Sequence, residues 1–143
     1  MPHADGTAEF EVQKNGSRTI RFSDGDYSME DNFFGGDPYG GQQVVFFKNE
    51  PCWMMVYYGG IYEEITNPDG LYDFLREALQ NPPKKLPFRG PESYKNNNFE
   101  YKNQIAGSDA EFSGNEKIFK DGKQVYWAKY IGGLVDQRFN GSL

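Results

Sequence analysis

The sequence predicts an α+β domain with a curved, mainly antiparallel sheet, built from two related three-stranded meanders plus an N-terminal hairpin, with one main helix packed on it. An internal repeat places two similar strand pairs in one short chain. The 17 Gly and 8 Pro residues suit many short strands and tight turns, and only one stretch carries a helical pattern. A chain of 143 residues has the usual size of one domain, so we expect residues 1–143 to fold as a single unit.

The repeat is the most informative feature of the chain. Residues 41–60 reappear without a gap as residues 114–133, and each copy ends in an aromatic-rich strand followed by Gly-Gly. Two copies separated by a helical stretch favour a duplicated sheet over a solenoid or propeller. The identical positions include Gly41 and Gly114, Phe46 and Phe119, Tyr57 and Tyr130, Gly59 and Gly132, and Gly60 and Gly133.

The N-terminal part is expected to begin with a disordered leader at residues 1–7. Residues 10–22 are predicted to form a hairpin, in which Asn15-Gly16 provides the residues with positive φ that a tight turn needs. Residues 27–60 and 99–133 are then the two related β units. Each unit is predicted to be a three-stranded meander, because residues 99–105 repeat the pattern of residues 27–33 at a spacing one residue shorter than the main repeat.

One helix is predicted between the two units, over residues 68–80. Asn67 can cap it, Pro68 fits its first position, and the run 81–83, Asn-Pro-Pro, ends it. Its apolar residues recur at the spacing of one helix face, which should cover the sheet. These residues are Leu71, Phe74, Leu75, Ala78 and Leu79.

Composition excludes several classes of function. The net charge of −6 argues against nucleic-acid binding by this chain alone, because that binding depends on Lys and Arg displacing counterions. The basic cluster at Lys117, Lys120 and Lys123 is expected to be a solvated face. No apolar run long enough for a membrane helix and no signal peptide are present, so we expect a cytoplasmic protein without membrane contact. Cys52 is the only cysteine, and we expect neither a metal nor a cofactor.

Alternation along the two repeated strands places four aromatic residues on matching faces: Trp53, Tyr57, Tyr126 and Tyr130. They can line a pocket for a small, partly apolar ligand, and ordinary core packing is the competing and more favoured explanation. The opposite faces, which carry Val56 and Ile131 among others, are also apolar. This pattern predicts central strands that are covered on both sides.

Polar residues near this aromatic face are the other candidates for a binding site. The guanidinium of Arg89 can hold a carboxylate or phosphate of a ligand, or pair internally with Glu92 or Glu116. Asp31 and Glu116 can serve a ligand or act as structural anchors. Catalysis by Ser-His or Cys-His is nearly excluded because His3, the sole histidine, lies in the leader.

The chain also resembles a bacterial family known only as a domain of unknown function. The resemblance covers about residues 22–135. The motifs that carry it are residues 31–36 (DNFFGG), 51–59 (PCWMMVYYG), 87–94 (PFRGPESY), 112–116 (FSGNE) and 130–133 (YIGG). Some members of that family look fused behind a helix-turn-helix domain of the XRE type. The resemblance implies no reaction and no ligand, and the N-terminal hairpin of this chain departs from the family pattern.

These observations lead to three hypotheses about function. The first is a cytosolic binding or sensor-like module with an aromatic-lined site for a small molecule, formed by the candidate residues named above. The second is a carboxylate-dependent enzyme with Glu116 or Asp31 as base and Arg89 as its electrostatic partner. The third is a protein-interaction or homodimerisation domain that uses exposed strand edges and tyrosines.

Overall fold

The computed structural model describes residues 10–62, 68–80 and 89–135 of the chain. In these ranges it contains nine strands and one helix, α1. The expected leader at residues 1–7 and the expected helix cap at Asn67 lie outside the described residues. In chain order the elements are β1 (Glu11–Val12), β2 (Arg18–Asp24), β3 (Tyr27–Gly35), β4 (Tyr39–Phe47), β5 (Glu50–Ile61), α1 (Pro68–Leu79), β6 (Ser93–Asn96), β7 (Phe99–Ser108), β8 (Glu111–Lys120) and β9 (Lys123–Leu134).

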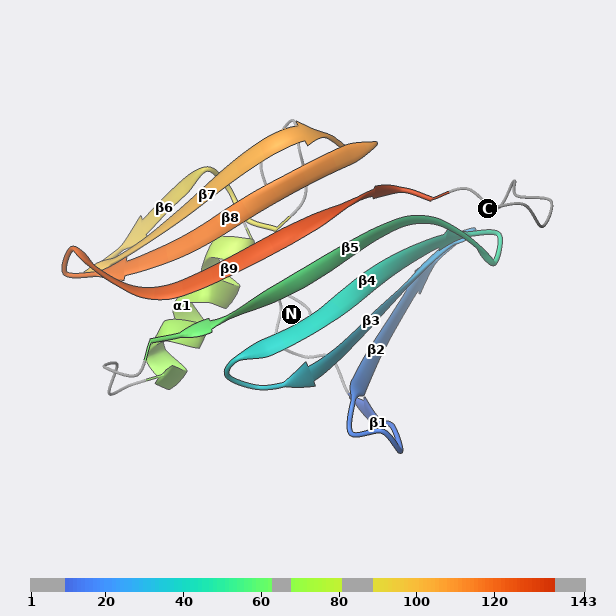
Figure 1. Ribbon diagram of the computed structural model, residues 1–143, viewed down its shortest axis with the longest axis horizontal. Coiled ribbons are helices and arrows are strands. Elements are labelled where there is room, and N and C mark those ends of the chain that lie inside the picture. Colours follow the sequence, from blue (N-terminus) through green and yellow to red (C-terminus); the bar gives the residue numbers. More distant parts are fainter. Residues whose placement is uncertain (1–9, 63–67, 81–88, 136–143) are drawn as a thin grey trace.

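All nine strands belong to one antiparallel sheet in the order β1-β2-β3-β4-β5-β9-β8-β7-β6. The sheet is strongly curved, and α1 lies behind it in the view of Figure 1, on the inner side of the curve. The predicted α+β class, with an antiparallel sheet and one helix, is confirmed. No helix among the described residues is long and apolar enough to cross a membrane.

The pairing of β5 with β9 forms the centre of the sheet. Both strands are 12 residues long, and Tyr57 lies opposite Tyr130 in their register. On its other side each tyrosine lies opposite a glycine, Gly41 for Tyr57 and Gly114 for Tyr130. A register shift interrupts each of these outer pairings, at Val45/Phe46 in β4 and at Ile118/Phe119 in β8. The sheet is therefore interrupted at matching places on both sides of its centre.

Helix α1 packs with its apolar face on the inner side of the sheet. Leu71, Phe74, Leu75 and Ala78 are all buried. The Phe74 ring stacks on Phe99 of β7, with ring centroids 5.1 Å apart, and also contacts Tyr94 of β6. The spacing of apolar residues in the sequence therefore selected the face that covers the sheet.

The two faces of the central strands have different environments. The inner face is buried at Met55, Tyr57, Tyr126, Ala128 and Tyr130. On the outer face the side chains of Val56 and Ile131 remain 45% and 62% exposed. The expectation that both faces are covered is wrong here, because α1 lies on the inner side alone. β-branched residues suit the pleated backbone even where they are exposed.

Replacing Gly114 tests the close packing at the centre of the sheet. A Cβ at Gly114 would lie 2.1 Å from Cζ of Tyr130, whose ring is buried. We expect Gly114→Ala to lower the free energy of unfolding by about 1–3 kcal/mol because that ring has to move. The control is Gly36→Ala, where a Cβ meets no atom within 4 Å. Urea unfolding followed by circular dichroism measures both, and equal stabilities of the two variants would contradict the packing described.

Candidate functional site

A buried ion pair lies at the centre of the inner face. Arg89 approaches from the segment that follows α1, and Glu116 projects inward from β8. Nε and one terminal nitrogen of Arg89 donate to the same carboxylate oxygen of Glu116, at 2.9 and 2.5 Å. Both side chains are almost completely buried, at 3% and 0% exposure. The internal pairing of Arg89 with Glu116, one of the alternatives left open by the sequence, is therefore present.

Hydrogen bonds connect this ion pair to neighbouring side chains on β7 and β9. The Tyr101 hydroxyl donates to the second carboxylate oxygen of Glu116 and accepts from the Gly90 backbone N–H at 3.2 Å. The Asn103 amide donates to the Gly90 carbonyl oxygen at 2.9 Å, and its own oxygen accepts from the Tyr130 hydroxyl at 2.6 Å. The backbone N–H and the carbonyl group of Gly90, the residue after Arg89, are thus both hydrogen-bonded to side chains of β7.

Two further tyrosine contacts extend the cluster to the other half of the sheet. Tyr57 donates its hydroxyl proton to the buried carboxylate of Asp31, and Tyr39 shares a hydrogen bond with Tyr126. The Arg89 guanidinium lies over the rings of Tyr57 and Tyr130, with its central carbon 5.5 and 6.0 Å from their centroids. We call this set of residues the Arg89 cluster. It comprises Asp31, Tyr39, Tyr57, Arg89, Tyr101, Asn103, Glu116, Tyr126 and Tyr130.

The cluster holds its arginine and its tyrosines in fixed protonation states. Burial raises the pKa of Tyr57, Tyr101 and Tyr126, and the neighbouring carboxylates of Asp31 and Glu116 raise the first two further. Burial alone would lower the pKa of Arg89, but the Glu116 carboxylate and the surrounding tyrosines raise it well above its ordinary value. The arginine is therefore charged and the tyrosines are neutral over the whole physiological range.

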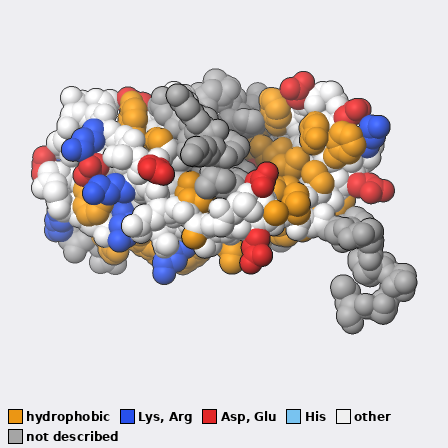
Figure 2. Space-filling model, turned by 90° about the horizontal axis from the view of Figure 1, so that it is seen from above, with side chains coloured by type: hydrophobic (Ala, Val, Ile, Leu, Met, Phe, Trp, Pro, Cys, Tyr) orange, Lys and Arg blue, Asp and Glu red, His pale blue; other side chains and the backbone are white. Residues whose placement is uncertain are grey.

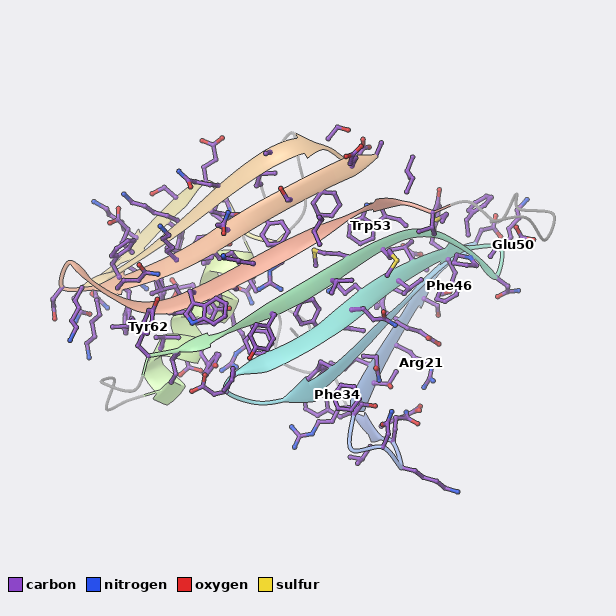
Figure 3. The ribbon with its side chains drawn as sticks, in the orientation of Figure 1. Arg21, Phe34, Phe46, Glu50, Trp53 and Tyr62 are labelled. Carbon is purple, nitrogen blue, oxygen red and sulfur yellow. The ribbon has the colours of Figure 1, made fainter. Side chains whose placement is uncertain are left out.

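Six of the seven predicted ligand-binding residues belong to the Arg89 cluster: Asp31, Tyr57, Arg89, Glu116, Tyr126 and Tyr130. The seventh, Trp53, lies further along the inner face and stacks on Phe112, with ring centroids 5.5 Å apart. Figure 3 shows Trp53 and Tyr62 near opposite ends of β5. Among the described residues no buried side-chain nitrogen or oxygen lacks a hydrogen-bond partner. The buried polar groups of the cluster therefore satisfy one another's hydrogen-bonding capacity.

A cleft of about 180 Å³ opens next to the cluster, between the β2–β4 part of the sheet and α1. Tyr39 belongs to both the cluster and the cleft, because its hydroxyl contacts Tyr126 and its side chain lines the cleft. The cleft has aromatic walls, two glycines and two arginines. Its lining residues are Phe10, Arg18, Phe33, Gly35, Gly36, Tyr39, Tyr72 and Arg76.

The two arginines of the cleft differ in their partners. Arg76 of α1 pairs with Asp73 on the same helix. Arg18 of β2 makes no ion pair with any residue in the described part of the chain, and its guanidinium carbon lies 5.8 Å from the centroid of the Phe10 ring. The cleft therefore combines an available cation with aromatic walls, a combination that suits a small anionic ligand containing a ring.

The arginines of this cleft were not among the site residues predicted from the sequence. Arg18 and Ile20 are two residues apart on β2, so both side chains lie on the same face of the strand. Because Ile20 is buried, that face is the inner one, and the charged Arg18 also lies on it. Tyr72 and Arg76 are four residues apart, the spacing that places them together on one side of α1. Both signals are visible in the sequence. They became interpretable only when the fold brought β2 and α1 together.

No metal-binding group is evident in residues 10–62, 68–80 and 89–135, where no three His, Cys, Asp or Glu side chains lie close enough to hold an ion. Asp31 and Glu116, the two carboxylates proposed as catalytic bases, are 1% exposed and accept hydrogen bonds from tyrosines. Neither of them lines the cleft.

Comparison with known proteins identifies one family. The family described as "Domain of unknown function (DUF5680)" matches residues 31–135 of the chain. The match includes the Arg89 cluster and most of the cleft, whereas Phe10 and Arg18 precede it. No curated protein and no solved structure matches the chain significantly.

The buried ion pair makes a direct prediction about stability. We expect Arg89→Met to lower the free energy of unfolding by about 3–5 kcal/mol, because Glu116 is then left as an uncompensated buried charge. The double variant Arg89→Met/Glu116→Gln removes both charges and should recover a large part of the loss. Urea unfolding of the two variants decides the matter. If the double variant is no more stable than Arg89→Met, the stability lost in Arg89→Met does not come from the unpaired charge of Glu116.

The buried tyrosines predict a loss of stability in alkali. Because the pKa of Tyr57, Tyr101 and Tyr126 is raised in the folded state, their protons are held more tightly there than in the unfolded chain. Their contribution is complete below the unfolded pKa of about 10 and is lost as the pH rises above it, by about 1.4 kcal/mol per pH unit for each group. Urea unfolding at increasing pH, with tyrosinate absorbance as second signal, checks this. A free energy of unfolding that stays constant above about pH 10 would contradict it.

Proposed function

The chain belongs to the DUF5680 family, a domain of unknown function, and from the geometry of the cleft we propose that it binds a small organic anion that contains an aromatic ring. The proposal moves the ligand from the buried aromatic residues expected from the sequence to the cleft beside them. Tyr57 and Tyr126, two of the candidate residues, contact Tyr39 and so support the site from behind, whereas Trp53 lies further along the inner face.

The single observation that carries this proposal is Arg18. The protein has a net charge of −6, and 21 acidic residues outnumber 15 basic ones. An arginine in a cleft without an ion-pair partner among the described residues is therefore unusual here. A guanidinium presents a planar set of donors that matches a carboxylate in two-pronged fashion. Arg76, on the opposite wall, adds a second positive charge that Asp73 partly offsets.

The walls of the cleft define the rest of the ligand. Phe10 packs edge-on against Phe33, with ring centroids 5.6 Å apart, and Tyr72 closes the α1 side while its hydroxyl donates to the Gly36 carbonyl oxygen at 3.3 Å. A volume of about 180 Å³ is similar to that of the apolar cavities of about 150 Å³ that hold benzene. One ring with a short anionic substituent matches this space.

The Arg89 cluster supports the proposal by making the cleft rigid. Tyr39 is 4% exposed, its ring lies 5.9 Å from that of Tyr57, and its hydroxyl contacts Tyr126. A wall that is already fixed in the free protein loses little conformational entropy when a ligand binds. We infer that the buried hydrogen bonds contribute to affinity in this indirect way.

The proposal extends to the origin of the sheet and to a sensor-like role. The register supports a duplication, because Gly41 faces Tyr57 as Gly114 faces Tyr130, and the register shifts of β4 and β8 fall 73 positions apart, at Val45/Phe46 and Ile118/Phe119. The sequence resemblance implies bacterial relatives in which such a domain follows an XRE-type DNA-binding domain. Because Phe10 and Arg18 of the cleft precede the residues that match the family, we propose the sensor-like role for this chain alone, as ligand capture in the cytoplasm.

The test is thermal unfolding with benzoate, compared with acetate, which lacks the ring, and benzyl alcohol, which lacks the charge. We expect benzoate alone to raise the melting temperature. At about ten times its Kd the stabilisation is about 1.4 kcal/mol, or about 3–6 °C for a domain of this size. Arg18→Gln should abolish the effect of benzoate.

Arg21→Gln is the matched control for this test, because Arg21 lies on the same strand but pairs with Glu11 and Glu30 outside the cleft. This variant should respond to benzoate as the wild type does. A shift of equal size with benzyl alcohol, or an equal loss in both arginine variants, would refute the proposed site, as would the absence of any shift with benzoate.

A further inference from the structure

The outer face of the sheet carries a second arrangement of polar and aromatic side chains, on the opposite side from the cleft. Cross-strand register aligns them in two adjacent rows over β7, β8, β9 and β5. We call these rows the outer grid. The first row is Lys102, Lys117 and Trp127, and the second row is Gln104, Asn115, Lys129 and Tyr58.

A hollow of about 540 Å³ lies over the outer grid. Lys117, Trp127 and Lys129 line it, together with the amide side chains of Gln104 and Asn115. Glu116 also borders the hollow, but its carboxylate is 0% exposed and points inward to Arg89. A second hollow over β5, β8 and β9 shares Asn115 and Lys129 with the first. The outer grid is therefore a concave area without an exposed carboxylate in its lining.

The lysines of the grid are arranged unfavourably for the free protein. Lys102 and Lys117 lie directly opposite one another, and like charges in that position destabilise a sheet. Neither of them, nor Lys129, forms an ion pair with another residue of the described ranges. Glu100, the acidic neighbour on β7, is already paired with Lys95. Lys102 lies over the Phe119 ring, with its amine 5.8 Å from the centroid, so Lys117 and Lys129 are the two without a compensating contact in the described ranges. In a protein of charge −6, such a pair of neighbouring lysines indicates an anionic ligand.

Trp127 provides the apolar part of the site. Its ring is partly exposed and leans on Tyr58, with centroids 5.6 Å apart and an angle of 59° between the rings. Tyr62, beyond the end of β5, borders the same hollow and is 42% exposed. Aromatic side chains beside lysines stack with the bases of nucleotides, and amides can hydrogen-bond to the edges of a base.

The distribution of charge over the molecule agrees with this location. Figure 2 shows most of the Lys and Arg side chains gathered toward the end of the molecule that carries the β6–β7 and β8–β9 turns, and hydrophobic side chains gathered toward the opposite end. A phosphate would thus be attracted to the same end as the outer grid.

We propose that the outer grid binds a nucleoside monophosphate, with the base stacked on Trp127 and the phosphate held by Lys117 and Lys129. This site is separate from the cleft because the two lie on opposite faces of the sheet and share no lining residue. A mononucleotide, rather than a nucleic-acid strand, is favoured because the three lysines form one compact group and the protein as a whole is acidic.

Quenching of tryptophan fluorescence by adenosine monophosphate tests the proposal. The Trp53→Phe variant leaves Trp127 as the single tryptophan, and excitation at the red edge of its band avoids absorption by the base. We expect saturable quenching by adenosine monophosphate and much weaker binding of adenosine or inorganic phosphate. Lys117→Gln and Lys129→Gln should each weaken binding at least about threefold. Calorimetry on the wild-type protein gives the same comparison if Trp53→Phe does not fold.

Lys123→Gln is the matched control, because it removes the same charge from the first residue of β9, outside the grid. Its affinity for adenosine monophosphate should equal that of the wild type. Equal weakening by Lys117→Gln and Lys123→Gln would reduce the effect to general electrostatics and overturn the proposal. Inorganic phosphate binding as tightly as the nucleotide would also overturn it, and so would an oligoadenylate that binds far more tightly and depends on Lys123.

Discussion

The buried ion pair of Arg89 and Glu116 is the interaction on which the inner side of this protein depends. Taking two charges out of water costs several kcal/mol each, and only good geometry with further hydrogen bonds offsets that cost. Here the carboxylate accepts from Arg89 and from Tyr101, while the guanidinium lies over two tyrosine rings. Because the pair connects the segment after α1 to β8, it also fixes how the chain returns from the helix to the sheet.

The curvature of the sheet explains why charges behave differently on its two faces. Inside the curve side chains converge, so the Asp31 and Glu116 carboxylates are buried and accept hydrogen bonds from their neighbours. At the margin of this face, where β2 meets α1, Arg18 lies in a cleft without an ion-pair partner in the described ranges. On the outside the side chains diverge toward water, and the lysines of the outer grid lie side by side without an acidic partner in the described ranges, where an anionic ligand can reach them.

Prediction from the sequence succeeded where a signal is local and failed where it depends on distant elements. The helix spacing and the alternation in β5 and β9 identified the buried face, and the chemistry of Arg89 suggested Glu116 as a partner. Neither signal shows that Arg18 and Arg76, which lie 58 positions apart, border one cleft. The outer grid was not predicted, for the same reason. Lys117 was interpreted as one of a solvated cluster, and its neighbours across the sheet are set by the strand register, which the repeat alone does not determine.

Under the proposed duplication, the polar residues of the inner face show how two halves of one sheet acquired different properties. Asp31 lies opposite Gln43 in the first half, and Asn103 lies opposite Glu116 in the second, so acid and amide have exchanged strands. Tyr57 donates to the acid in one half, whereas Tyr130 donates to the amide in the other. Arg89 breaks the symmetry by pairing with Glu116, although its guanidinium lies over the rings of Tyr57 and Tyr130 alike. A symmetric frame can thus keep one half as a rigid core while the other half, with β2 and α1, forms the open cleft.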